Sequence, residues 1–181
     1  MMPDRTSERS TVQFTLITAP ALAALLAGSL EQASDLVGLQ LPAFFLTQNW
    51  LWQYRLDQIR ADPSAAPWLV RAVFGRPADA VVGHAGFHGP PDAAGMVEIG
   101  YSIVPEFRRR GYGRAAAIQL IEYAAASPDV TRLRASVSPN NVASLALIRS
   151  LGFEQSGEQW DDEDGLELVF ERPPVFSFSA A

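Results

Sequence analysis

The amino-acid sequence predicts a mixed α/β (α+β) fold, with a mostly antiparallel central sheet of about seven strands flanked by four helices. Two patterns lead to this prediction. Short runs of alternating apolar and polar residues recur between turn-forming residues, and short connections favour antiparallel pairs. Between these runs lie segments whose apolar residues recur with helical spacing. With 181 residues and 48% hydrophobic content, the chain can bury one substantial core.

The first part of the chain is predicted to form one strand and two helices. Residues 11–17 alternate as a strand should, and a helix is predicted at 19–27. Thr18 suits the N-cap of that helix and Gly28 suits its end. A second, longer helix is predicted at 43–61, where apolar and aromatic residues recur with helical spacing.

The remaining chain is predicted to supply the rest of the sheet and two more helices. The expected elements are strands at 68–74, 80–87 and 96–104, a helix at 111–126, a strand at 131–137, a helix at 142–150 and a hairpin of 153–160 with 166–171. Together they predict a single domain at 11–172, between a flexible N-terminal tail at 1–10 and a C-terminal tail at 173–181.

Composition excludes several classes of function. The 14 basic and 20 acidic residues leave a net charge of -6, which argues against a nucleic-acid partner. The absence of Cys excludes disulfides, zinc-thiolate sites and a thiol nucleophile. The apolar run at 16–27 is too short to span a bilayer, so we expect a soluble, cytoplasmic protein with no membrane partner, either a monomer or a homodimer. His84 and His88 lack metal-ligand partners and are predicted to be strand or cleft-wall residues, so no metal is expected.

The sharpest local signal for chemistry is a basic, glycine-containing run between the strand that carries Glu98 and the helix that follows. This run consists of Arg108, Arg109, Arg110, Gly111, Tyr112, Gly113 and Arg114. Its glycines allow close backbone approach, and its amides and the helix start suit a pyrophosphate. The alternative is a tight strand-to-helix turn with a solvated basic face. The preceding strand, the four arginines and the Ala-rich helix favour phosphate binding.

This run, with the pattern Arg108-x-x-Gly111-x-Gly113 after the strand at 97–104, resembles the acetyl-CoA signature of the GNAT N-acetyltransferase superfamily. The order of elements also matches. The segment 140–144, followed by Leu-Gly-Phe at 151–153, resembles the second cofactor-side motif of that superfamily. The resemblance covers about residues 11–172, and it is strongest to the RimJ/RimL-like branch, mainly through Ser144 and the final hairpin.

The resemblance implies a GNAT-like fold with acetyl-CoA as co-substrate. The amides of Ile103 and Val104 would hold the pantetheine arm, and one near Ser102 or Ile103 would polarise the thioester carbonyl. The amides of residues 109–114 would hold the pyrophosphate, and Asn141 would contact the cofactor from the opposite helix. The implied cofactor-binding residues are Ser102, Ile103, Val104, Arg108, Arg109, Arg110, Gly111, Tyr112, Gly113, Arg114, Asn141 and Ser144.

The acceptor amine needs a base, because a primary alkylamine with a pKa of about 10.4 is mostly ammonium at neutral pH. The resemblance assigns this role to Glu98, and strand alternation places Glu98 on the same face as Gly100 and Ser102. The alternative is an exposed strand residue or a partner for a nearby Arg.

Protonation of the leaving thiolate is a separate question. Where some members of the superfamily carry a tyrosine acid, this chain has Ile148. Ser144 and Tyr101 are the candidates, although Ser144 could equally cap a backbone carbonyl and Tyr101 could belong to the core. A thiolate also leaves readily without full protonation.

The resulting hypothesis is an N-acetyltransferase in which a primary amine attacks acetyl-CoA directly in a ternary complex, since no Cys is present to relay the acetyl group. The acceptor is a small-molecule amine or a protein N-terminal amine; polyamines, amino acids and aminoglycosides all fit the chemistry. The alternative is a catalytically silent CoA-binding regulatory domain of the same fold.

Two further features each have a structural and a functional interpretation. Eight of the 20 acidic residues fall at 154–171 and could attract a cationic amine, but Asp and Gly at 161–165 also suit a solvated hairpin turn. Core packing is the simpler interpretation of a group of aromatic residues, part of which could line an acceptor pocket or a dimer contact. This group comprises Phe44, Phe45, Trp50, Trp52 and Tyr54.

Overall fold

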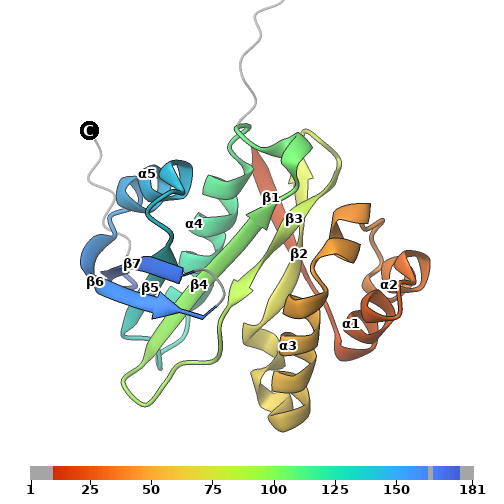
Figure 1. The fold of residues 1–181 in the computed structure, drawn as a ribbon, viewed down its shortest axis with the longest axis horizontal. Helices are drawn as coiled ribbons and strands as arrows, with labels where there is room; N and C mark the ends of the chain where they lie inside the picture. Colours follow the sequence, from red (N-terminus) through yellow and green to blue (C-terminus); the bar gives the residue numbers. More distant parts are fainter. Residues whose placement is uncertain (1–9, 163–164, 176–181) are drawn as a thin grey trace, which may run out of the picture. The chain divides into compact units, whose positions relative to one another are not determined.

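The computed structural model describes residues 10–162 and 165–175, and its strands form a mixed, mostly antiparallel sheet (Figure 1). The strands are hydrogen-bonded in the order β1-β2-β3-β4-β5-β7-β6. Their bounds are β1 Thr11–Leu16, β2 Val70–Arg76, β3 Ala80–Phe87, β4 Met96–Ile103, β5 Arg132–Val137, β6 Glu154–Asp161 and β7 Gly165–Arg172. The pair β4–β5 is parallel, whereas β1–β2, β5–β7 and β6–β7 are antiparallel. The predicted fold class is confirmed.

Five α-helices and three short 3-10 helices occur within the described residues, so the prediction of four helices is wrong. The α-helices are α1 Ala19–Leu26, α2 Leu30–Val37, α3 Asn49–Ala61, α4 Tyr112–Ala125 and α5 Val142–Ser150. The 3-10 helices are η1 Ala43–Thr47, η2 Pro63–Trp68 and η3 Pro105–Phe107. None of the helices in the described part of the chain combines the length and apolar character that crossing a membrane requires.

The helix that the sequence did not predict is α2. It has only eight residues and ends at Gly38, whose positive φ of 75° is the left-handed conformation common after a helix. Its buried residues are Ala33, Ser34 and Val37, and the Ser34 hydroxyl accepts the amide of Leu41 at 3.0 Å. A helix of eight residues is too short to show a clear helical period in the sequence. Its burial in the hydrophobic core, rather than a local pattern, therefore accounts for α2.

The single helix predicted at 43–61 is interrupted at Gln48, between η1 and α3. The break lets two large aromatic side chains from separate elements face each other. The indole nitrogen of Trp52 donates to the carbonyl oxygen of Phe45 at 2.5 Å, and the two rings stack with centroids 5.5 Å apart. Tertiary packing has therefore replaced the continuous helical hydrogen bonding that the local pattern suggested. The predicted strand at 68–74 is also displaced to 70–76, because η2 occupies residues 63–68.

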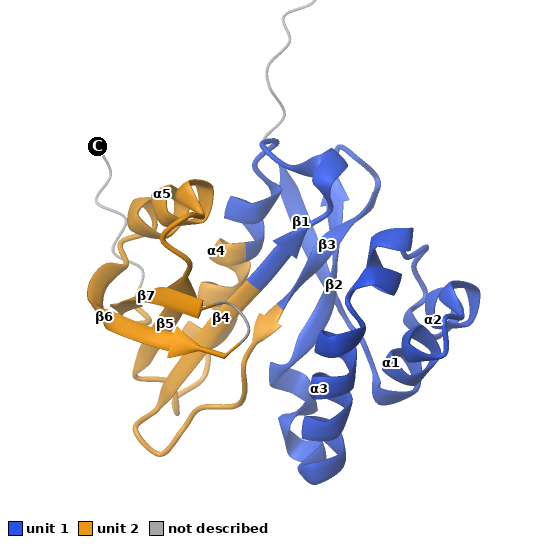
Figure 2. Cartoon of the chain, viewed as in Figure 1, with its two compact units in different colours: residues 1–85, 101–116 blue, residues 86–100, 117–181 orange. Residues whose placement is uncertain are grey.

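The described chain divides into two compact units (Figure 2). Unit 1 comprises residues 1–85 and 101–116, and unit 2 comprises residues 86–100 and 117–181. Strands β3 and β4 and helix α4 each contribute residues to both units.

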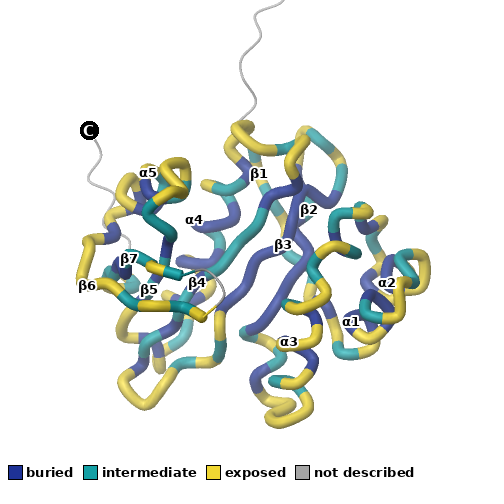
Figure 3. Tube along the Cα trace, in the orientation of Figure 1, coloured by how far each residue is buried: buried dark blue, intermediate teal, exposed yellow. Residues whose placement is uncertain are grey.

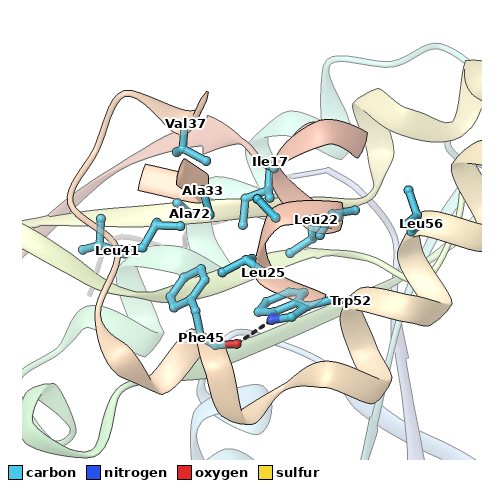
Figure 4. Close-up of a cluster of buried hydrophobic side chains, with 14 residues drawn as sticks. Ile17, Leu22, Leu25, Ala33, Val37, Leu41, Phe45, Trp52, Leu56 and Ala72 are labelled. Atoms are coloured by element: carbon cyan, nitrogen blue, oxygen red, sulfur yellow. Dashed lines mark hydrogen bonds between the residues drawn. The ribbon is translucent and has the colours of Figure 1, made fainter. Parts of the chain in front are cut away.

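Unit 1 has its own hydrophobic core, formed by α1, α2, η1 and α3 with residues of β2 and β3 (Figure 4). Phe45, Trp52, Leu22 and Ala33 are fully buried within it. In Figure 3 the central strands of this unit are dark blue over most of their length, as expected for strands whose two faces are both covered. The predicted aromatic group is thus divided, because Trp50 and Tyr54 stay more than half exposed.

Unit 2 has a second core made by residues of α4, β5, α5 and β7. Its buried side chains include Leu120, Leu133, Leu145, Ile148 and Phe170. Strand β6 lies at the end of the sheet order and is exposed along most of its length, and its Trp160 is 75% exposed. Within the acidic turn predicted at 161–165, Glu163 and Asp164 lie outside the described residues, as do residues 1–9 and 176–181 of the two predicted tails.

Candidate active site

Glu98 lies in β4 with a side chain that is 13% exposed. Its strand alternates as predicted, because Val97 and Ile99 are buried while Glu98 and Gly100 are half-buried on the other face. A carboxylate oxygen of Glu98 lies 3.8 Å from Nδ1 of His88, and the Glu98 carbonyl accepts the His88 amide at 2.8 Å. Glu98 therefore faces a second titratable side chain that the sequence prediction did not connect with it.

Strand β4 pairs with β5 only over its first residues. The described register runs from Met96 opposite Arg132 to Glu98 opposite Arg134, whereas β5 goes on pairing with β7 as far as Val137. Among the described pairs, Glu98 is thus the last residue of β4 that is matched to β5. The edge of β4 beyond Glu98 is therefore a candidate surface for a ligand.

The end of β4 shows which amides can serve such a ligand. The Val104 amide donates to the Val82 carbonyl at 2.9 Å, so it already serves the β3–β4 pair. The Ile103 carbonyl instead accepts from Nε of Arg108 at 2.9 Å. Because the polar groups of successive strand residues point to opposite edges, the Ile103 amide shares the edge away from β3. Of the two amides predicted to hold pantetheine, only that of Ile103 lies on this edge.

The basic run forms a loop between η3 and α4. Arg108, Arg109, Arg110 and Arg114 are all exposed, and α4 begins at Tyr112. Arg109 and Gly111 have positive φ angles of 59° and 86°, a conformation that is uncommon outside glycine. The loop therefore combines exposed guanidinium groups, a strained backbone and the start of a 14-residue helix, which are features of anion sites.

The Tyr112 side chain is buried beneath the basic loop and packs against the protein interior, so it does not face a ligand. Its side chain is 2% exposed, and its hydroxyl oxygen accepts the Ala78 amide at 3.1 Å. Its ring packs edge-on against Phe107, and a Cβ atom at Gly75 would lie only 2.8 Å from it. Gly113 follows in the first turn of α4. The Tyr112 side chain thus holds the glycine loop in place, and only its backbone is offered to a phosphate.

The predicted acid candidates lie on different elements. Tyr101 and Ser102 are half-buried in β4, and the Tyr101 hydroxyl is buried. Ser144 lies in the first turn of α5, where its amide donates to the Asn141 side chain at 3.1 Å. Asn141 is therefore the N-cap of α5. Ile148 is 1% exposed and belongs to the core of unit 2.

The predicted site residues fall on both units. Glu98, Asn141 and Ser144 belong to unit 2, whereas Tyr101 and the residues from Ser102 to Arg114 belong to unit 1. Strand β4 contributes residues to both sets. No group of three or more His, Asp or Glu side chains within residues 10–162 and 165–175 could hold a metal ion.

His84 is a core residue and not part of a cleft wall. It is 6% exposed and lies among the rings of Phe44, Phe45 and Trp52, with centroids 5.1–6.2 Å away. Burial, followed by the positive charge of Arg55, lowers the pKa of His84 from 6.5 to about 4. His84 is therefore a neutral imidazole at physiological pH.

His88 is the candidate functional residue that the sequence did not connect with Glu98. The signal was the short connection between two predicted strands, which places residues near its two ends opposite each other. The register itself depends on the loop, in which Asp92 accepts the amides of Ala94 and Met96 at 2.8 and 2.9 Å. Those two bonds, with that of Met96 the stronger cause, lower the pKa of Asp92.

Comparison with known proteins is consistent with this arrangement. Residues 42–154 match the family model described as Acetyltransferase (GNAT) domain, so the chain belongs to the GNAT acetyltransferase family. An uncharacterized N-acetyltransferase of Bacillus subtilis, YjdG, is 40% identical over 73 residues, which are 40% of this chain and 44% of the relative. The p20 protein of Bacillus licheniformis, also an uncharacterized N-acetyltransferase, is 34% identical over 79 residues, which are 44% of this chain and 44% of the relative. The chain thus matches less than half the length of these two relatives.

Solved structures are similar over much more of the chain. A Vibrio cholerae protein, provisionally named a ribosomal-protein-serine acetyltransferase, has a TM-score of 0.61 at 25% identity and covers 96% of this chain and 100% of its own. RimJ of Mycobacterium smegmatis, solved with CoA-disulfide, has a TM-score of 0.61 at 17% identity and covers 91% and 84% of the two chains. The second similarity concerns the fold alone.

Proposed function

We propose that this protein transfers an acetyl group from acetyl-CoA to a primary amine, by direct attack within a ternary complex, with Glu98 as general base. The observation that carries the proposal is the arrangement along β4. A carboxylate that is 13% exposed comes first, then the part of β4 beyond its described pairs with β5, and then an exposed basic loop. We infer that residues 11–172, which include both units, act as one acetyltransferase domain.

Each part of this arrangement has a role in the proposed reaction. The Ile103 amide donates a hydrogen bond to the pantetheine arm. The backbone amides of residues 109–114 and the arginines of the basic loop hold the pyrophosphate. Asn141 would approach the same co-substrate from α5. Acetyl-CoA supplies the activated thioester, and Glu98 takes a proton from the bound ammonium so that the neutral amine can attack. Glu98 and Ile103 are five residues apart in an extended strand, or about 17 Å, which is too far for one water molecule to bridge, so a chain of water molecules carries the proton from the amine to Glu98.

The acid that protonates the thiolate is assigned to Ser144 or Tyr101. Ser144 is half-buried at the start of α5, and this location favours it because the helix start stabilises negative charge nearby. The Tyr101 hydroxyl is buried, which favours a packing role. A cytoplasmic location remains a prediction from the sequence.

Two classes of acceptor deserve to be tested first, a protein N-terminal amine and a small-molecule amine. The name of the Vibrio cholerae relative points to ribosomal proteins, and another solved structure with a TM-score of 0.57 at 17% identity is an aminoglycoside acetyltransferase. A panel of N-terminal peptides of ribosomal proteins, polyamines, amino acids and aminoglycosides covers both classes.

The deciding experiment measures release of CoA thiol from acetyl-CoA across that panel. We expect turnover with at least one acceptor class, and a loss of about 100-fold or more in kcat for Glu98→Gln, the size typical of a missing general base. Glu122→Gln on the exposed face of α4 removes the same charge elsewhere and should keep full activity. Tight binding of acetyl-CoA without thiol release from any amine would instead support a silent CoA-binding domain.

A further inference from the structure

We propose that His88 is a positioning residue for Glu98 and the exit route for the proton that Glu98 removes from the acceptor amine. This inference rests on the proposed function, because it assigns a partner to the proposed base. The two side chains come from opposite ends of the β3–β4 connection and meet on one face of the hairpin.

The geometry pairs these two side chains closely. Nδ1 of His88 lies 3.8 Å from a carboxylate oxygen of Glu98, and the two backbones are joined by the bond from the His88 amide to the Glu98 carbonyl. A separation of 3.8 Å is short enough for an ion pair and for transfer after a small side-chain rotation or through one water molecule. The backbone bond keeps this separation short without relying on either side chain.

Gly100 makes room for the imidazole ring. A Cβ atom at Gly100 would lie 3.1 Å from Nε2 and 3.5 Å from Cδ2 of His88, so the ring lies directly over this glycine. Any larger residue would push the ring away from its present place above the strand. We call the side chains of Glu98 and His88, with the imidazole ring over Gly100, the Glu98–His88 pair.

The other charges around Glu98 have partners of their own. Arg134 is opposite Glu98 in β5, but it donates from Nη2 and Nε to Glu171 at 2.7 and 3.1 Å. Arg132 contacts the same carboxylate group at 3.1 Å. Asp92, in the connection before β4, accepts backbone amides. Glu171 thus holds both arginines of β5, which leaves His88 as the partner that faces the Glu98 carboxylate.

The different solvent exposure of the Glu98 and His88 side chains suits them to different steps of proton transfer. The Glu98 side chain is 13% exposed, whereas that of His88 is 53% exposed. In the reaction an ammonium group loses two protons, of which one ends on the CoA sulfur and the other must reach the solvent. The bond from nitrogen to that second proton breaks as Glu98 accepts it, and the proton then passes to Nδ1 of His88 while Nε2 releases one to water.

Transfer in this direction is favourable. In reference compounds the pKa of imidazole, about 6.5, exceeds that of a glutamate carboxyl, about 4.3, so a neutral carboxylic acid gives its proton to imidazole. Each turnover would then return Glu98 to the carboxylate form that the next ammonium requires. Without His88 the largely covered Glu98 would have to discharge its proton through slower water contacts.

The first test measures the pair without any acetyl transfer. The chain has only two histidines, and the pKa of His84 is lowered to about 4, so the second imidazole signal in an NMR titration belongs to His88. In Glu98→Gln we expect its midpoint to fall, because a carboxylate 3.8 Å away stabilises the imidazolium. Glu122→Gln should leave the midpoint unchanged. An unchanged midpoint in Glu98→Gln would overturn the pair while leaving the proposed function untouched.

The second test measures kcat and KM from pH 6 to 10 with the best acceptor of the panel. We expect His88→Gln to lower kcat about tenfold near pH 7, to leave both KM values within about twofold, and to lose the limb of the pH profile whose midpoint matches the NMR titration. Added imidazole should restore His88→Ala and should not restore Glu98→Gln. Wild-type kcat for His88→Gln at every pH, or an effect on KM alone, would overturn the relay.

A third variant tests the contact while keeping His88 in place. Gly100→Ala should lower kcat more when His88 is present than in the His88→Ala background, because the added methyl moves the ring by a few tenths of an ångström. Equal effects in both backgrounds would contradict this. Melting temperatures and CoA affinity of all variants separate loss of the relay from loss of the fold. Absence of thiol release by the wild type with every acceptor would overturn the proposed function itself, and the NMR titration would still report on the pair.

Discussion

The Nε atom of Arg108 donates a hydrogen bond to the carbonyl oxygen of Ile103 at 2.9 Å, and so joins the basic loop to the last residue of β4. Five residues separate these partners along the chain, and η3 lies between them. The bond sets the distance between the edge proposed for pantetheine and the loop proposed for the pyrophosphate. A side chain that was predicted to supply charge thus also supplies geometry.

Arg108→Gln should therefore weaken acetyl-CoA binding more than catalysis. We expect KM for acetyl-CoA to rise about tenfold and kcat to stay within about twofold, because the change removes a charge-assisted bond and a phosphate partner. Steady-state kinetics with varied acetyl-CoA measure this. Arg60→Gln removes an exposed arginine of α3 and is the matched control. Equal KM values for the two variants would contradict the role of Arg108.

Gly83→Ala should separate β3 from β4 close to the proposed site. A Cβ atom at Gly83 would lie 2.1 Å from the carbonyl oxygen of Ser102, which is backbone and cannot simply turn aside. We expect the free energy of unfolding to fall by about 1–3 kcal/mol, or more if the strands part, in a denaturant titration. Gly89→Ala is the control, since a Cβ atom there would meet open space. Wild-type stability for Gly83→Ala would show that the strands are not held as closely as described.

Variants of Asn141 can separate capping from cofactor contact. The Asn141 side chain accepts the Ser144 amide at 3.1 Å, so Asn141→Ala should cost about 1 kcal/mol of stability. Asn141→Asp keeps a good cap and should keep that stability. If Asn141 also contacts acetyl-CoA, the Asp variant should raise KM for acetyl-CoA, because it places a negative charge near phosphate groups. An unchanged KM would restrict Asn141 to the helix cap.

His84 should make the stability of unit 1 depend on pH. Its pKa is about 4 in the folded chain against an ordinary value of 6.5, so the unfolded chain binds a proton first as the pH falls. Stability is then complete above about pH 6.5 and decreases through the window from 6.5 to 4, by up to about 3 kcal/mol. His84→Phe, with a similar ring among Phe44, Phe45 and Trp52, should remove this decrease. Chemical denaturation at pH 7 and pH 4.5 measures it, and an equal pH dependence in the variant would refute the assignment.

Several elements could be predicted from the sequence because their signals are local. The bounds of α5 are those predicted, and β3 was also predicted at 80–87. Apolar periodicity and turn residues act between near neighbours in the chain, so they survive in any tertiary context. Two of the regions that differ from the prediction are those where packing competes with local preference. At Gln48 the Phe45–Trp52 contact interrupts a helix, and α2 is too short for a period to show.

The candidate site also has features that the sequence predicts and features that depend on tertiary packing. The glycine loop, the strand glutamate and the asparagine segment are sequence patterns, and the family match at 42–154 includes all three. Which amide of β4 is free to hold a ligand could not be predicted, because the Val104 amide is taken by Val82 only after the strands have paired. The roles of Glu98 and Ser144 remain proposals for the variants above.

Residue order and local periodicity are enough to predict the family and the fold class, and they indicate the stretch of chain proposed to carry the chemistry. Three relationships are visible only in the folded chain: His88 faces Glu98, Glu171 holds Arg134, and His84 is buried among aromatic rings. Those relationships depend on strand register and on the desolvation of side chains. Both arise from contacts between residues far apart in the chain, which no local pattern specifies.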